Sequence, residues 1–173
     1  MRMISLVSTL FALATAATLA PARADDAPAA RLVKTLTGTW KGPLHLTMGA
    51  DQADLKAAIA CAPIAGKTGI ACQASITGVP GLGTMLESDL FGVDPTTGAA
   101  HMYAVSNAGD VHDHVGGFEQ DALVMRWTGT SPDHHALRET LTFRSTGPRT
   151  LAFTQEVTSD GKPFVKLEGT LKK

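Results

Sequence analysis

Short segments with alternating apolar and polar residues follow one another from residue 40 to the end of the chain, and turn residues separate them at intervals of roughly 8–12 positions. Alternation with a period of two is typical of strands that bury one face. The strands expected on this basis are residues 40–47, 70–77, 85–93, 99–106, 111–118, 122–128, 137–144, 150–158 and 163–171. Consecutive strands with tight connections form a meander, and closing the meander removes its exposed edges. The sequence therefore predicts an all-β fold, an antiparallel up-and-down barrel of about 8–10 strands.

The segment DQADLKAAIACA, residues 51–62, is compatible with two structures. Leu55, Ala58 and Ile59 have helical spacing, and the segment is rich in alanine, which favours a helix. The cysteine pairing described next requires its second half to be extended. We expect a strand near Cys61 and leave residues 51–60 open between helix and strand.

The two cysteines of the chain, Cys61 and Cys72, flank the segment APIAGKTGIA. A two-residue turn at Gly66-Lys67 would place them directly opposite each other in an antiparallel pair. Opposed Cα atoms in such a pair lie ~4.5–5.5 Å apart, within the range of a disulfide. The spacing predicts a structural disulfide between Cys61 and Cys72.

The N-terminal residues are typical of an export signal. A positive start is followed by an apolar run, residues 4–19, and then by the small residues of Ala22-Arg23-Ala24. We predict that residues 1–24 are a cleaved secretory signal peptide, that residues 25–30 are a loose leader, and that residues 31–173 form a single β-barrel domain. The expected location is periplasmic or secreted, where disulfides persist.

The charge of the expected mature chain argues against one class of partner. Without Arg2 and Arg23, the 15 Lys and Arg residues fall to 13 against 16 Asp and Glu, a formal charge of −3. No basic run is longer than Lys172-Lys173, so no nucleic-acid partner is expected. The mature chain contains no second segment long and apolar enough for a predicted membrane span.

Two segments carry a resemblance to known β-barrels. The opening LTGTWKG, residues 36–42, resembles the Gly-x-Trp strand of the lipocalin and nitrobindin-like barrels, the calycin group. The later run LFGVDPTTGAAHMYAVSNAGDVHDHVGGFE resembles an uncharacterised family of small exported bacterial lipocalin-like proteins. The resemblance implies a calycin-like barrel and no particular activity.

The stretch GDVHDHVGG, residues 109–117, holds two histidines that a strand would point in the same direction. If Ala108-Gly109 is a two-residue turn, Tyr103 lies opposite His114 and His101 lies opposite Gly116. His101, Tyr103, His112 and His114 would then share one face of the sheet.

The neighbouring strands indicate which face is the interior. A turn at Gln120-Asp121 would place Met125 opposite Gly116 and Trp127 opposite His114, and the alternation of residues 123–127 makes this the inward face. Extension to the preceding strand adds Asp89 and Glu87 to that face. The candidate ligand-binding residues are Glu87, His101, Tyr103, Met125, His112, His114 and Trp127.

Several functions are compatible with such an interior, because buried polar groups need a partner. The histidines can pair with other side chains as part of an ordinary core, or face solvent. They can also line a pocket for a small hydrophobic or mixed-polarity ligand, which is the function we predict, without catalysis and without a cofactor. The alternative is a metal-binding protein or metal-dependent enzyme in which His101, His112 and His114 hold a transition metal, or a haem-binding protein.

Other features are expected to carry no chemistry. The chain contains no Gly-x-Ser-x-Gly motif and no P-loop, so no catalytic residues are predicted. His45, His134 and His135 are expected to face solvent. Nothing in the sequence specifies the ligand or an oligomeric state.

Overall fold

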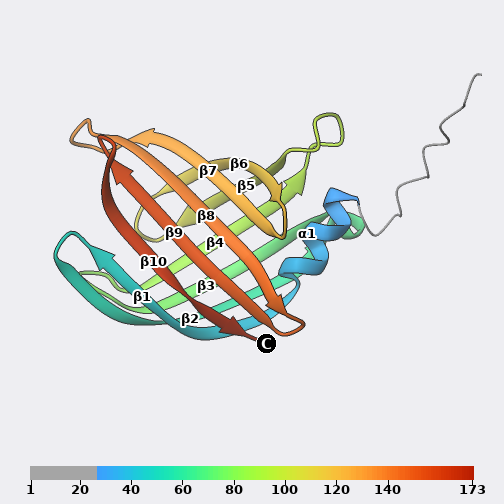
Figure 1. The fold of residues 1–173 in the computed structure, drawn as a ribbon, viewed down its shortest axis with the longest axis horizontal. Coiled ribbons are helices and arrows are strands. Elements are labelled where there is room, and N and C mark those ends of the chain that lie inside the picture. Colours follow the sequence, from blue (N-terminus) through green and yellow to red (C-terminus); the bar gives the residue numbers. More distant parts are fainter. Residues whose placement is uncertain (1–26) are drawn as a thin grey trace, which may run out of the picture.

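The computed structural model describes residues 27–173, which form one short helix and a closed barrel of ten antiparallel strands. Each strand pairs with its neighbours in the chain, and β1 pairs with β10 to close the barrel (Figure 1). The elements are α1 (Pro28–Leu36), β1 (Gly38–Met48), β2 (Asp51–Ile64), the 3₁₀ turn η2 (Ala65–Lys67), β3 (Gly69–Val79), β4 (Gly83–Val93), β5 (Ala100–Ser106), β6 (Val111–Glu119), β7 (Ala122–Thr130), β8 (Ala136–Gly147), β9 (Thr150–Ser159) and β10 (Lys162–Lys172). The predicted all-β up-and-down barrel is confirmed. The predicted signal peptide, residues 1–24, lies outside the described residues.

The helix α1 is a departure from the sequence-based expectation. Residues 28–30, expected in a loose leader, form its first turn, with Pro28 at a position where the missing N–H costs nothing. Leu32 and Leu36 lie one turn apart and are buried against the barrel. The indole N–H of Trp40 donates a 2.7 Å hydrogen bond to the carbonyl of Leu36. These contacts hold the helix at one end of the barrel (Figure 1).

The ambiguous segment 51–62 is part of strand β2. Its burial alternates, with Leu55, Ala57 and Cys61 buried and the residues between them exposed or half-buried. The helical spacing of its apolar residues is overridden because β2 pairs with β1 from Asp51 to Cys61. Pairing on both sides satisfies backbone groups that a local helix would otherwise satisfy.

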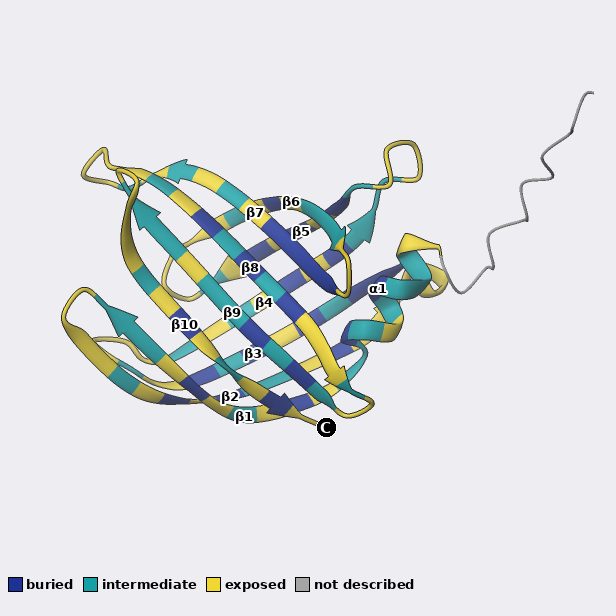
Figure 2. Cartoon of the chain, in the orientation of Figure 1, coloured by how far each residue is buried: buried dark blue, intermediate teal, exposed yellow. Residues whose placement is uncertain are grey.

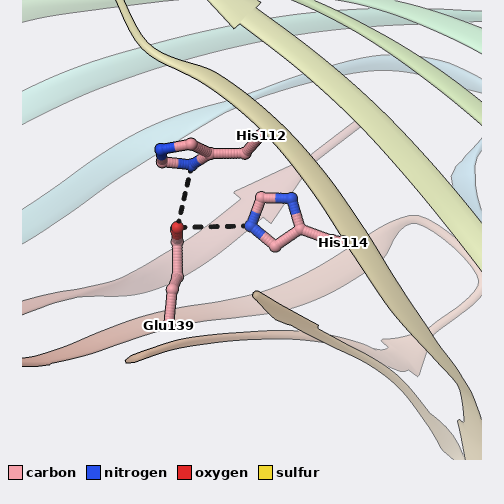
Figure 3. A group of neighbouring side chains, drawn as sticks. All are labelled: His112, His114 and Glu139. Carbon is pink, nitrogen blue, oxygen red and sulfur yellow. Dashed lines mark ion pairs between the residues drawn. The ribbon is translucent and has the colours of Figure 1, made fainter. Parts of the chain in front are cut away.

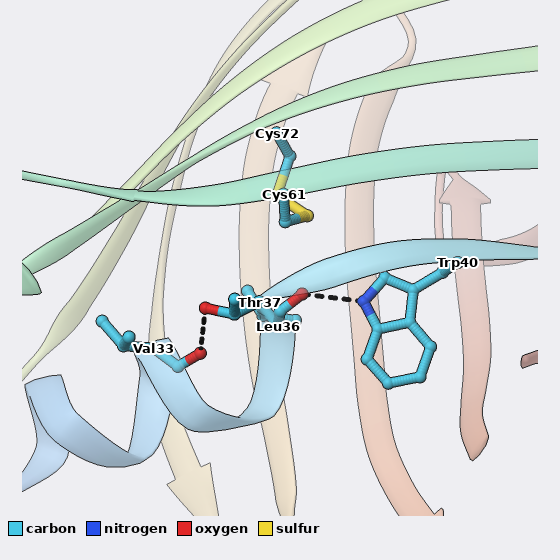
Figure 4. The surroundings of a disulfide bond; sticks show 6 residues. All are labelled: Val33, Leu36, Thr37, Trp40, Cys61 and Cys72. Atoms are coloured by element: carbon cyan, nitrogen blue, oxygen red, sulfur yellow. Dashed lines mark hydrogen bonds between the residues drawn. A yellow bond between two sulfur atoms is a disulfide. The ribbon is translucent and has the colours of Figure 1, made fainter. Parts of the chain in front are cut away.

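The predicted disulfide between Cys61 and Cys72 is present. The two residues are directly paired between β2 and β3, with Cα atoms 4.1 Å apart. Both side chains are buried near Leu36 and Trp40, where α1 joins the barrel (Figure 4). The bridge therefore ties β3, which the helix contacts, to the neighbouring strand β2.

Removing this bridge is expected to destabilise the barrel. The double substitution Cys61→Ala and Cys72→Ala should lower the free energy of unfolding by roughly 2–3 kcal/mol, because the bridge restricts a short loop of the unfolded chain. Urea unfolding of the variant and of the wild type measures the difference. An unchanged midpoint would mean that the bridge does not contribute to stability.

The interior of the barrel follows from the strand alternation. Alternate residues along the strands are buried, and the residues between them are half-buried or exposed (Figure 2). The buried side chains from all around the barrel form one hydrophobic cluster with Leu32 and Leu36 of α1. Within residues 27–173, no helix is both long and apolar enough to cross a membrane.

Candidate functional site

The barrel encloses a cavity of about 370 Å³. One end of it is bounded by Leu36, the last residue of α1. The opposite end lies where β1 finishes and β10 begins, and Met48 and the half-exposed Phe164 line it there. Most of the wall is apolar. The ionisable and amide side chains that line it are Glu87, Asp89, Asp110, His112, His114, Glu139 and Gln155.

Three of these side chains converge on one point. The Nδ1 atom of His112 and the Nε2 atom of His114 each lie 3.2 Å from the same carboxylate oxygen, Oε2 of Glu139 (Figure 3). The histidines come from β6, and the glutamate comes from β8 on the other side of β7. The three atoms lie within 4.8 Å of one another. We refer to His112, His114 and Glu139 as the His-His-Glu cluster.

The cluster is deeply buried on one side. The side chain of His114 is 1 % exposed and that of Glu139 is 4 % exposed, whereas His112 is 23 % exposed. The contact of His114 with Glu139 is close, but it lacks the direction of a hydrogen bond. Neither ring nitrogen of His114 has a hydrogen-bond partner among the described residues. A buried polar atom without a partner is costly, so an ion or molecule that pairs with a ring nitrogen of His114 would be stabilised at this site.

Two neighbours orient the cluster. The side-chain amide of Gln155 donates a hydrogen bond to Oε1 of Glu139, which leaves Oε2 to the histidines. The ring of His112 is stacked on Trp127, with ring centroids 3.9 Å apart and planes 18° from parallel. Glu139 and the ring of His112 are therefore each fixed by a second residue.

Burial also changes the acidity of the carboxyl groups that line the cavity. Burial, reinforced by the neighbouring Asp89, raises the pKa of Glu87 to about 8, and burial raises the pKa of Asp89 to about 6. Burial alone would also raise the pKa of Glu139, but His114, Gln155 and His112 together lower it. Near neutral pH the interior thus combines an ionised Glu139 with a largely protonated Glu87.

The predicted register between β5 and β6 is wrong by one residue. His114 lies opposite Met102, and Tyr103 lies opposite Asp113. The connection is a three-residue loop: the N–H of Ser106 donates to the carbonyl of Asp110 (3.0 Å), and Gly109 adopts a φ of 93°. An odd loop length shifts the pairing by one residue and exchanges the two faces of β5.

His101 and Tyr103 are consequently on the outer surface. Tyr103 is 49 % exposed, and the Nδ1 atom of His101 lies 3.8 Å from the carboxylate of Asp113, which is also exposed. Met102 and Ala104 take their place on the inner face. The predicted grouping of His101 and Tyr103 with His112 and His114 is therefore not present, and neither is a set of three histidines.

The predicted register between β6 and β7 is confirmed. Gly116 lies opposite Met125, and Trp127 and the two histidines all line the cavity. Glu87 and Asp89 line it as well. Met125 is fully buried in the core and does not line the cavity.

Glu139 and Gln155 were absent from the sequence-based set, although the sequence carries a signal for both. Each residue occupies an inward-facing position of its strand, and the neighbouring inward-facing positions on either side are apolar. Glu139 falls between Leu137 and Leu141, and Gln155 falls between Phe153 and Val157. A charged or amide side chain that faces the interior needs a hydrogen-bond or ion-pair partner there.

The remaining histidines lie on the surface, as expected. His45 pairs with Asp54 at 3.0 Å, and His135 pairs with Asp160 at 2.7 Å. Both pairs are exposed and far less enclosed than the His-His-Glu cluster, which makes them suitable controls for it.

Comparisons with known proteins identify the fold and not the function. No protein-family model matches the chain, and no curated protein matches it. Among solved structures, the crystal structure of Rv2717c from M. tuberculosis is similar, with a TM-score of 0.62 and 17 % sequence identity, over 85 % of this chain and 98 % of that chain. At this identity the likeness shows a shared barrel fold, and the lipocalin and nitrobindin-like resemblance stays a prediction.

Proposed function

We propose that this barrel is an exported, non-catalytic protein that binds one small molecule of mixed polarity in its interior. The observation that carries the proposal is the cavity of about 370 Å³, apolar over most of its wall and polar around the His-His-Glu cluster. Small-molecule sites in proteins are typically concave and mostly apolar, with a few polar groups that orient the ligand, and their volumes start at ~300 Å³. The ligand class is a small molecule with an apolar body and one polar end.

The distribution of residues suggests how such a ligand is oriented. Leu36, Phe91 and Leu151 line the cavity toward α1 and offer only apolar contacts. His112 and Glu139 lie near the first residues of their strands, at the opposite end. A ligand would place its apolar body against the inner wall and its polar end beside the cluster. The protonated Glu87 can donate a hydrogen bond to a carbonyl or hydroxyl oxygen.

Export is supported by the N-terminal sequence and by the disulfide. The apolar run and the small residues that end at Ala24 are typical of a secretory signal. A disulfide persists in the periplasm or outside the cell and is rare in the cytosol. We propose a periplasmic or secreted location on these grounds.

An apolar fluorescent probe tests the binding function. N-phenyl-1-naphthylamine should bind the wild-type protein and quench, by energy transfer, the fluorescence of Trp40 and Trp127, which both line the cavity. Ala74→Phe, on the inner face of β3, should weaken this binding at least tenfold because the ring occupies the cavity. Ala60→Phe, on the exposed face of β2, is the matched control and should bind the probe as the wild type does.

Thermal unfolding of Ala74→Phe gives a second readout. A phenyl ring that enters an open cavity should leave the melting temperature unchanged or raise it. In a filled interior the same substitution would cost roughly 1–3 kcal/mol. Absence of probe binding to the wild type, or an equal loss in Ala60→Phe, would overturn the binding proposal.

A further inference from the structure

We propose that the His-His-Glu cluster is a binding site for one divalent transition-metal ion, with His112 Nδ1, His114 Nε2 and Glu139 Oε2 as its ligands. The inference goes beyond the small-molecule function and does not depend on it. It differs from the three-histidine set expected from the sequence, because His101 lies outside the barrel and Glu139 takes its place.

The distances fit an ion at the centre of the cluster. A tetrahedral ion bound at ~2.0–2.1 Å holds its donor atoms about 3.3 Å apart. The two separations between nitrogen and oxygen in the cluster are both 3.2 Å, and the third pair of atoms is within 4.8 Å. Small side-chain movements are enough to bring all three atoms onto one ion.

The unpartnered nitrogen of His114 provides an independent argument. Its side chain is 1 % exposed, and its Nε2 atom lies 3.2 Å from Oε2 of Glu139 without the geometry of a hydrogen bond. A cation between Nε2 and Oε2 would satisfy the lone pairs of both atoms. The same cation would compensate the burial of the Glu139 charge, which would otherwise be costly.

Two of the three proposed ligands, Glu139 and His112, are held by neighbouring residues. Gln155 holds the second oxygen of Glu139, and Trp127 fixes the plane of the His112 ring. Partners of this kind orient metal ligands and commonly change metal affinity by about 10–100-fold. In the exposed pair of His45 with Asp54, by contrast, no further described residue forms a side-chain hydrogen bond with either partner.

The donor set indicates the class of ion. Two imidazoles and one carboxylate suit Zn²⁺, Fe²⁺, Co²⁺ or Ni²⁺, whereas Ca²⁺ and Mg²⁺ prefer oxygen ligands alone. All three residues line the cavity, so a further coordination position would face its interior. That position could accept a donor atom from a bound molecule, which would place the ion at the polar end of the cavity.

Titration of the EDTA-treated protein with ZnCl₂ and CoCl₂ tests the site. By calorimetry, the wild type should bind one Zn²⁺ per chain, and the Co²⁺ form should show the visible absorption bands of a four- or five-coordinate ion. Glu139→Gln and His114→Ala should each weaken Zn²⁺ binding at least ~100-fold, and Gln155→Leu should weaken it about 10–100-fold. His45→Ala, which disrupts an exposed pair with Asp54, should bind Zn²⁺ as the wild type does.

Three results would overturn the proposed metal site. Absence of stoichiometric Zn²⁺ binding by the wild type overturns it, and so does unchanged affinity in Glu139→Gln or an equal loss in His45→Ala. If His114→Ala does not fold, as judged by circular dichroism, the folded Glu139→Gln and His112→Gln variants decide instead. Ala74→Phe should retain Zn²⁺ while losing the apolar probe, so the two proposals can fail separately.

Discussion

Raising the pH from about 5 to about 8 is expected to lower the free energy of unfolding of the metal-free protein by on the order of 3 kcal/mol. The substitution Glu87→Gln should remove most of this fall. Burial holds the pKa of Glu87 at about 8 in the barrel, against an ordinary value of 4.5. Between these two values the folded state binds more protons than the unfolded state, so stability falls as the pH rises.

The groups that face Glu87 do not reverse this direction. Asp89, on the same strand, has a pKa raised to about 6 and adds to the fall in the lower part of the range. Glu139 on β8 has a lowered pKa, so its contribution to stability is lost only in more acidic solution. His114 on β6 acts to lower the pKa of Glu87, but its effect is smaller than the increase caused by burial and by the neighbouring carboxylates.

Urea unfolding at several pH values, in the presence of EDTA, measures the effect. Glu87→Gln keeps the size of the side chain and mimics its protonated form, so the variant should be less sensitive to pH than the wild type. Glu156→Gln removes an exposed carboxylate from β9 and should leave the pH dependence intact. A wild-type stability that is constant or rises between pH 5 and pH 8 would show that Glu87 is ionised in the folded barrel.

The parts of the fold that could be predicted from the sequence are those with local signals. Period-two alternation located the strands. The spacing of Cys61 and Cys72 about Gly66-Lys67 predicted a pairing that the structure contains. The register of β6 with β7 was also predicted correctly, because the turn at Gln120-Asp121 is the two-residue turn that was assumed.

The error at β5 has a local physical cause. A loop of three residues instead of two, from Asn107 to Gly109, exchanges the faces of β5. The hydrophobicity of the residues does not indicate which face of this hairpin is the interior. Its outer face carries Tyr103, Val105 and Val111, which are apolar enough for a buried face. The inner face holds smaller and more polar residues because it borders a cavity.

The candidate site could be predicted only in part because it is built from strands distant in the sequence. His112 and His114 are two residues apart on one strand, so their spacing alone places them on the same face. Glu139 reaches them only through the pairing of β7 with β6 and β8, which places Trp127 opposite Glu139. Such a contact depends on the register of two hairpins, so Glu139 can be assigned to the site only when both registers are known.

The substitution Gly116→Ala is expected to lower the free energy of unfolding by at least about 3 kcal/mol, whereas Gly117→Ala should be neutral or slightly stabilising. A Cβ atom at Gly116 would lie 1.9 Å from the carbonyl oxygen of Val124 and 2.9 Å from the Cα atom of Met125. Both are backbone atoms of β7, so the strands would have to separate. At Gly117 a Cβ atom would meet nothing within 4 Å, and alanine reduces the entropy of the unfolded chain.

The close approach of β6 and β7 at Gly116 also affects the candidate site. Gly116 lies two residues beyond His114, and separating β6 from β7 would move the histidines away from Glu139, which β7 holds in register. Gly116→Ala should therefore lose Zn²⁺ affinity together with stability, while Gly117→Ala should keep both. Chemical unfolding and Zn²⁺ calorimetry of the two variants measure these effects. Equal stability of the two variants would contradict the close approach of β6 and β7 at Gly116, on which the position of the cluster depends.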